Sequence, residues 1–263
     1  MLNIIKSQSY QLKRDNFFYY ALLAAGYIFF MSAVIGQSKQ LLSINGATFA
    51  SEWASMSLTY TVLVFVLVLA CRIVGGDYND KTVNYEILSG HSRSTIYWSR
   101  MVACFMWIIP TALILMLFPV FFLTILNGWG DNAEFWPTML RFLLALLPVV
   151  RMICEFSLLT LIFRNCYFGM IFGFIIAESV EMSVSIIDLY NDTDFCRFIA
   201  SQNMMRMLGV ENARLGFVNG EDIMLYDSMP TAENVILTVC MSVGVSALCL
   251  FLGWLLTKKR DLH

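Results

Sequence analysis

The sequence has few charged side chains and almost no histidine. Only 14% of its 263 residues are Asp, Glu, Lys or Arg, and two are histidines, whereas 59% are hydrophobic. Soluble domains have about a quarter of their residues charged, so this composition excludes an ordinary soluble protein and indicates a polytopic, all-α integral membrane protein. The net charge of −2 is too small to suggest a nucleic-acid partner, and no basic stripe is present, so we expect none.

The sequence also lacks the patterns of a disulfide framework, a metal site or a nucleotide site. It has no C-x-x-C pair and no Cys/His cluster. Five of its seven cysteines lie in apolar runs, which predicts free, buried thiols and no bound metal. The stretch "GGDYNDKT" is not a phosphate-binding loop, because Asp80 stands where the second glycine of G-x-x-x-x-G-K-[ST] is required. We therefore expect no cofactor on this chain.

What the sequence does have is six long apolar segments. A bilayer core of about 30 Å needs roughly 20 apolar residues per helix, and six segments meet this length: 17–36, 53–74, 101–126, 138–163, 167–188 and 234–257. They fill most of the chain and predict a single transmembrane domain, 1–263. The first segment is too long for a signal peptide, and no small-residue cleavage site follows it.

The distribution of Lys and Arg predicts the orientation. With both termini in the cytoplasm, the inner side holds eleven cations: Lys6, Lys13, Arg14, Arg72, Lys81, Arg93, Arg100, Arg164, Lys258, Lys259 and Arg260. The outer side then holds five: Lys39, Arg141, Arg197, Arg206 and Arg214. Arg151 remains inside a span. We expect a multi-pass protein of the plasma membrane with both termini cytoplasmic.

Two amphipathic segments are predicted to be helices outside the spans. Leu2, Ile5, Ser9 and Leu12 fall on one helical face, which suits a short helix on the inner membrane surface. In the outer loop 189–233, Thr193 is placed to cap a helix that ends at Gly209. Its apolar stripe suits a helix on the outer surface or over a pore. The stripe consists of Phe195, Phe198, Ile199, Met205 and Leu208.

The polar stretch between the second and third spans is predicted to contain a cytoplasmic helix. Residues 82–89 form a short helix candidate, Gly90 is placed to end it, and Ser94 is placed to cap the next helix. Apolar Tyr85 and Leu88 on such a helix favour contact with a partner. The alternative is a solvated connector.

This stretch, "DYNDKTVNYEILSGHSRSTIYWSRMV", resembles the segment between spans two and three of ABC type-2 exporter permeases (ABCG-like transmembrane subunits of compact Gram-positive type). The matching positions are Asp77, Thr82, Leu88, Ser89, Ser92, Arg93, Ile96, Tyr97 and Arg100. Six spans and a long outer loop also agree. The resemblance implies that the segment is a coupling helix that docks on a separate ATPase subunit. The expected contact residues are Thr82, Tyr85, Glu86, Leu88, Ser92 and Arg93.

The resemblance also implies the partners and the function. ATP and Mg would bind to a dimer of ATPase subunits, and this chain itself would not be an enzyme. A second permease copy or a related permease would complete the transporter in the lipid bilayer. It would move antimicrobial peptides or other amphipathic compounds out of, or away from, the membrane.

Four ionisable residues lie at membrane depth, where charge is costly and functional by default. Arg151 and Glu155 are one helical turn apart, and Glu178 and Glu181 lie in the fifth span. Counting from the turn between these spans places Arg151 and Glu178 at equal depth, about 20 Å from the turn at 1.5 Å per residue. We therefore predict an Arg151–Glu178 pair with Glu155 beside it. The pair would fix helix packing or contact substrate.

Small residues and prolines add two open questions. Gly169, Gly173 and Ala177 repeat every four residues and permit close packing of backbones. The contact is either with a second permease subunit or within this chain. Pro110, Pro119 and Pro148 lie inside spans, as hinges or as static bends.

Two other function classes remain open from the sequence. An ion-coupled secondary transporter would use Glu155, Glu178 and Glu181 as a proton relay. It would be favoured by inverted repeats, which the sequence does not display. A membrane-embedded enzyme would need a catalytic constellation, and the two histidines are both predicted to be cytoplasmic.

Overall fold

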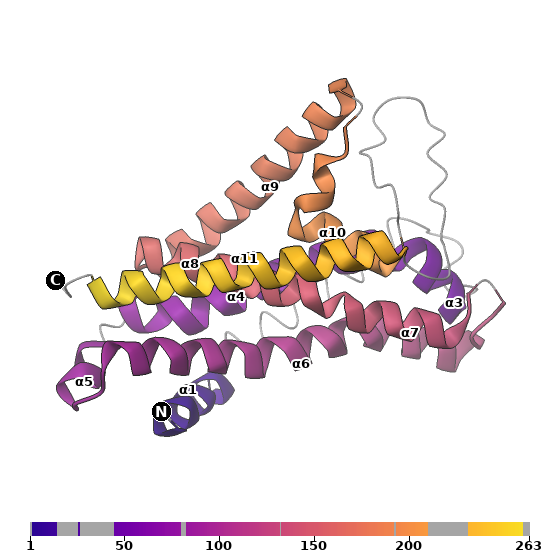
Figure 1. Ribbon diagram of the computed structural model, residues 1–263. Coiled ribbons are helices and arrows are strands. Elements are labelled where there is room, and N and C mark those ends of the chain that lie inside the picture. The colour runs from indigo at the N-terminus through magenta and orange to yellow at the C-terminus, as the bar shows by residue number, and fades with distance from the viewer. Residues whose placement is uncertain are drawn as a thin grey trace.

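Long apolar helices dominate the computed structural model, which describes residues 2–14, 26, 45–79, 83–131, 133–191, 193–209 and 231–259 (Figure 1). About 90% of the described residues are helical, and none is in a strand. A helix satisfies its backbone hydrogen bonds internally, as a lipid environment requires. The all-α fold class is therefore confirmed for the described part of the chain.

The elements follow one another with short connections. In chain order they are α1 (Leu2–Arg14), α3 (Gly46–Thr48), η2 (Phe49–Trp53), α4 (Ala54–Asn79), α5 (Val83–Leu88), α6 (Arg93–Asn127), α7 (Phe135–Leu144), α8 (Leu146–Phe163), α9 (Cys166–Asn191), η3 (Phe195–Phe198), α10 (Ala200–Leu208) and α11 (Ala232–Lys259). The element η2 is a π-helical turn that leads directly into α4, and η3 is a 3₁₀ helix.

Five segments are long and apolar enough to cross a membrane. They are Leu58–Gly76, Arg93–Asn127, Phe135–Phe163, Cys166–Asn191 and Ala232–Lys258. These correspond to the second to sixth predicted spans. The first predicted span, 17–36, lies outside the described residues except for Gly26. The described part of the chain thus has the long apolar helices of a membrane protein, five of them able to cross a bilayer by length and composition.

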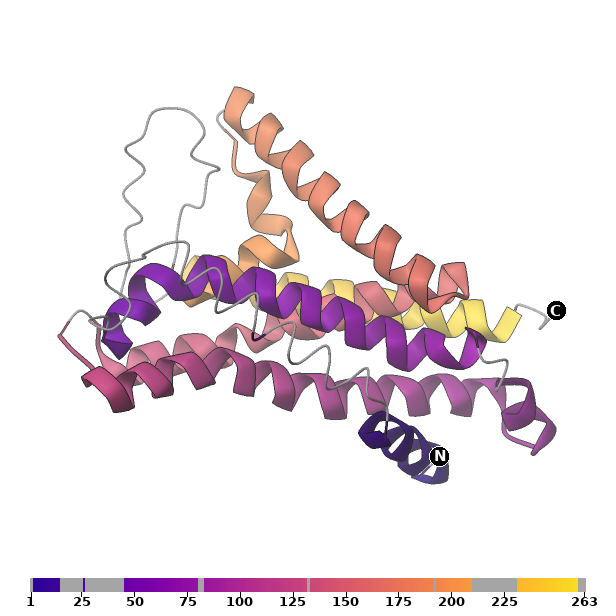
Figure 2. The same cartoon turned by 180° about the vertical axis from the view of Figure 1, so that it is seen from behind.

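The helices α4, α6, α8 and α11 run side by side, whereas α9 leaves the bundle at an angle (Figures 1 and 2). Helix α4 is central, because 78% of its most apolar window is buried, against 11% for α9. One end of the bundle carries α5 and the C-terminal end of α11, and we call it the α5 end. The other carries α3 and the start of α7, and we call it the α3 end.

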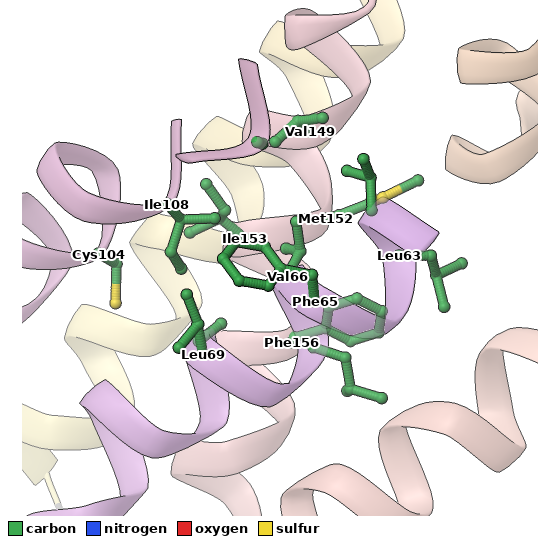
Figure 3. Packing of buried hydrophobic residues seen from close by; sticks show 14 of the residues in the cluster. Leu63, Phe65, Val66, Leu69, Cys104, Ile108, Val149, Met152, Ile153 and Phe156 are labelled. Atoms are coloured by element: carbon green, nitrogen blue, oxygen red, sulfur yellow. The ribbon is translucent and has the colours of Figure 1, made fainter. Parts of the chain in front are cut away.

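The core is formed where α4, α6 and α8 meet (Figure 3). Phe65 and Leu69 of α4 pack with Ile108 of α6 and with Met152 and Ile153 of α8, and all five are at most 1% exposed. Their dense packing fixes α8, the helix that carries the Arg151 and Glu155 charges.

A proline explains why the predicted fourth span, 138–163, is two helices. The break between α7 and α8 falls at Ala145, three residues before Pro148. Proline has no backbone N–H, and its ring collides with the carbonyl four residues earlier. In contrast, α6 is continuous through Pro110 and Pro119.

The N-terminal helix α1 is confirmed as a helix, and its packed face agrees in part with the predicted one. Leu12 is buried as predicted, whereas Ile4 and Gln8 are buried in place of Ile5 and Ser9, which are less buried. The partner of this face is α6, where the Trp107 indole N–H donates to the Ser9 hydroxyl at 3.1 Å. The helix is therefore attached to the bundle as well as being amphipathic.

Candidate functional site

The polar stretch after α4 forms α5 and the start of α6. Gly90 ends the α5 segment with a φ of +89°, a value that glycine adopts without strain. The cap of α6 is Ser92 and not the predicted Ser94: the Ser92 hydroxyl accepts a hydrogen bond from the Thr95 N–H at 3.2 Å. Ser94 lies inside the first turn, where its hydroxyl accepts a hydrogen bond from the Trp254 indole of α11 at 3.0 Å.

A buried arginine ties α5 to the base of α6. The Arg100 guanidinium contacts the Glu86 carboxylate at 3.0 Å, with the two side chains 3% and 22% exposed. The same guanidinium lies 5.4 Å from the centre of the Tyr78 ring of α4, within the range of a cation–π interaction. Arg100 therefore connects α5 to both α4 and α6.

The six predicted ATPase-contact residues divide into three groups. Thr82 and the side chain of Tyr85 lie outside the described residues. Glu86 and Ser92 have roles within the chain, one in the ion pair and one as the cap. Arg93 is partly buried, and Leu88 is 81% exposed. Leu88 is thus the described apolar side chain of α5 that is available to a partner.

Tyr97, a position of the family-like motif, serves packing. It is 4% exposed, and its hydroxyl donates to the Leu250 carbonyl of α11 at 2.9 Å. The glycine at 253 makes this approach possible, because a Cβ there would lie 2.7 Å from the Tyr97 hydroxyl. The motif therefore holds α6 against α11 as well as against α5.

The predicted Arg151–Glu178 pair is wrong. The Arg151 Nε donates to Glu155 on its own helix at 2.7 Å, and its Nη1 donates to the Phe198 carbonyl of η3 at 2.8 Å. The predicted contact between Arg151 and Glu155 is present. Oε1 of Glu178 is buried and has no hydrogen-bond partner among the described residues.

The failed pair follows from the course of α9. Counting residues from the turn assumed parallel axes, but α9 leaves α8 at an angle (Figure 1). Tyr60 of α4 is near enough for the charges of Glu178 and Glu181 to act on it. Equal depth therefore does not bring Arg151 and Glu178 together, and Arg151 bonds to η3 instead.

Two buried carboxylates of α9 bind the segment that follows it. Asp188, 4% exposed, accepts hydrogen bonds from the Thr193 hydroxyl at 2.7 Å and from the backbone N–H groups of Phe195 at 2.8 Å and Cys196 at 2.7 Å. Glu181, 5% exposed, accepts from the Ser201 hydroxyl and from the Gln202 amide at 2.7 Å. The contacts attach both η3 and α10 to α9.

These contacts correct the predicted outer helix. Thr193 does not cap it; its hydroxyl donates to Asp188, and Asp188 takes the capping role from the neighbouring helix. The single predicted helix is two, with a break at Ile199. Every residue of α10 is buried, so α10 does not lie on a surface but packs into the bundle against α4 and α8.

Sequence reasoning missed Asp188, which has the most hydrogen bonds of these carboxylates. It stands near the end of an apolar helix and five residues before Thr193. From the sequence alone, an acidic residue at this position resembles an ordinary solvated residue at a membrane interface. Its sequence signal was the spacing: Glu181 and Asp188 are seven residues apart and so share one helical face. Arg206 of α10 is likewise paired with Asp194, which directly precedes η3.

The small residues of α9 pack within the chain. A Cβ at Gly169 would lie 2.8 Å from the Thr160 hydroxyl of α8, and a Cβ at Gly173 would lie 2.7 Å from Leu67 of α4. The sequence left open whether these glycines pack against a second subunit or within the chain. In the described structure they pack within the chain. Ala177, on the same face, is partly buried and lines a cavity.

The cavity of about 660 Å³ lies between α8 and the diverging α9, with η3 and the start of α10 at one end. Its α8 wall includes Arg151, Glu155 and Phe156, and its α9 wall extends from Gly173 to Val184. Apolar walls with a few polar groups are typical of small-molecule sites. The cavity therefore contains two of the four predicted intramembrane charges.

All seven cysteines are free, as predicted, and all but Cys240 are buried. Cys196 of η3 is 7% exposed, and its burial, opposed by the Ser185 hydroxyl and reinforced by Asp188, raises the pKa of the thiol to about 11. The thiol is therefore both protected and protonated at neutral pH.

The chain matches no protein-family description, and no curated protein is significantly similar to it.

Proposed function

We propose that this chain is the membrane-spanning permease subunit of an ATP-driven exporter, with ATP hydrolysed by a separate dimeric ATPase. The proposal assigns the α5 end to the cytoplasm of a plasma-membrane protein whose termini are both cytoplasmic. A second copy or a related permease completes the pathway. The resemblance of the 77–102 segment to type-2 exporter permeases suggests this class.

The observation that carries the proposal is the attachment of α5. Leu88 is apolar and 81% exposed, and it lies on the short helix α5 between two of the long apolar helices, α4 and α6. A solvated connector needs no such side chain. The buried Glu86–Arg100 ion pair fixes this helix to α6, so a force applied to α5 by a partner reaches the bundle.

The test is co-purification of the chain with an ATPase subunit from its native membranes. Leu88→Asp places a charge in the proposed interface and is expected to abolish co-purification without affecting membrane insertion. Tyr10→Asp is the matched control: Tyr10 is also large, apolar and 64% exposed, but it lies on α1. Retention of the ATPase by Leu88→Asp, or equal loss in both variants, would refute this role of α5.

A further inference from the structure

The cavity between α8 and α9 is the strongest unassigned feature of the structure. Its volume of about 660 Å³ lies within the roughly 300–1,000 Å³ of small-molecule sites. The α9 wall from Gly173 to Val184 covers eleven residue steps, or about 16 Å at 1.5 Å per residue. A helical peptide of about 20 residues is about 30 Å long, so a whole antimicrobial peptide does not fit.

The polar groups of the cavity wall are unequally available. Arg151 is 10% exposed and already donates to the Glu155 carboxylate and the Phe198 carbonyl. Glu155 is 30% exposed, and only its Oε1 has a hydrogen-bond partner among the described residues. Its second oxygen is not among the buried unsatisfied atoms, so it can accept a hydrogen bond from a bound molecule.

The surroundings of Glu155 favour a cation. Three phenylalanines line the cavity, Phe156, Phe195 and Phe198, and aromatic ring faces attract cations. Glu181 lies behind Ser201, which is also part of the wall. The charge of Arg151 is balanced by Glu155, and Glu181 adds a second carboxylate behind the wall. The described carboxylates at the cavity therefore outnumber the one cation that lines it.

We propose that this cavity binds a lipophilic amine, a small molecule with an apolar body and one protonated amino group. The amine donates to the free oxygen of Glu155, and the apolar body lies between α8 and α9. Binding itself needs no ATPase. The further step, that such an amine is the transported substrate, rests on the export function proposed above.

Photo-crosslinking tests the site. The purified chain in lipid nanodiscs is exposed to three decyl probes that carry a diazirine and differ only in the head group: ammonium, hydroxyl or carboxylate. Labelled residues are identified by mass spectrometry. We expect the ammonium probe to label the α8 and α9 walls at least about tenfold more than the carboxylate probe. Equal labelling, or labelling spread over lipid-facing residues, would overturn the assignment.

Three variants distinguish the effect of the charge from the effect of the cavity space. Glu155→Gln is expected to reduce labelling by the ammonium probe to the level of the hydroxyl probe. Ala177→Trp fills the cavity and is expected to abolish labelling by all three probes. Ile175→Trp adds the same ring to the exposed side of α9, where Ile175 is 50% exposed, and is expected to change nothing. Unchanged labelling of Ala177→Trp would overturn the cavity as the site.

The two proposals fail separately. If the ammonium probe labels the α8 and α9 walls but is not moved in an ATP-dependent way, the amine site is supported and the export of amines is refuted. Export of another compound without localised labelling refutes the amine site and leaves the exporter standing.

Discussion

Asp188 is expected to hold η3 closed against α9. Its carboxylate accepts two backbone N–H groups and one hydroxyl at 2.7–2.8 Å. A hydrogen bond to a charged group contributes about 1.5–3 kcal/mol, and a buried donor without a partner costs about 1–3 kcal/mol. Asp188→Ala removes the acceptor of all three and should therefore destabilise the closed segment by about 2–5 kcal/mol.

Cys196 reports this opening, because the thiol is buried within the segment that Asp188 holds. A change of 1.4 kcal/mol is a factor of ten in an equilibrium constant, so even a cost of about 2 kcal/mol should raise maleimide labelling of Cys196 about thirtyfold. Labelling is measured in detergent, which removes sidedness, and is assigned to Cys196 by mass spectrometry. Asp188→Asn keeps an acceptor oxygen and should give an intermediate rate.

The matched control is Leu189→Ala, on the same helix turn but 52% exposed. Its labelling rate should stay within about a factor of two of the wild-type rate, because exposed substitutions change stability by about 0.5 kcal/mol or less. A wild-type rate in Asp188→Ala would show that the carboxylate does not stabilise η3.

Three further predictions follow from named contacts. The rate of maleimide labelling of wild-type Cys196 should keep rising between about pH 9 and 11, because the raised pKa keeps the thiol protonated below about 11. A rate that levels off near the ordinary thiol pKa of about 8.5 would contradict this. Glu86→Gln removes the charge opposite Arg100 and should lower the thermal midpoint, with a cost of about 1–3 kcal/mol; an unchanged midpoint would contradict a stabilising pair. Gly173→Leu should reduce the yield of folded protein, whereas Gly244→Leu, where a Cβ meets nothing within 4 Å, should not; equal yields would contradict the close approach of Leu67.

The sequence was sufficient to predict the helices, because apolar length and helix-ending residues are local properties. The five predicted spans within the described residues are helical and long enough to cross a membrane, although the fourth is divided at Ala145. Gly90 and Gly209 each follow the last turn of a helix with positive φ. The error at Ser94 was of two residues, because two serines flank the start of α6 and only hydrogen-bond geometry distinguishes them.

Side-chain partners across helices could not be predicted in the same way. The Arg151–Glu178 pair required knowledge of the angle between α8 and α9, and the observed partner of Arg151 is a carbonyl of η3, 47 residues away in the sequence. Asp188 accepts hydrogen bonds from the segment 193–196, and Glu181 accepts them from α10. The sequence alone does not show that the chain returns to these carboxylates. Composition indicates that a buried charge needs a partner, but not which partner.

We propose above that a separate ATPase, and not an ion gradient, supplies the energy for transport. The decisive measurement is uptake of the fluorescent or isotopically labelled amine probe into inside-out membrane vesicles that contain the chain and its co-purified ATPase. Uptake should require hydrolysable ATP, persist when an uncoupler collapses the proton gradient, and disappear in Leu88→Asp. Uptake driven by a proton gradient in the absence of ATP would contradict the account and would identify the chain as an ion-coupled transporter.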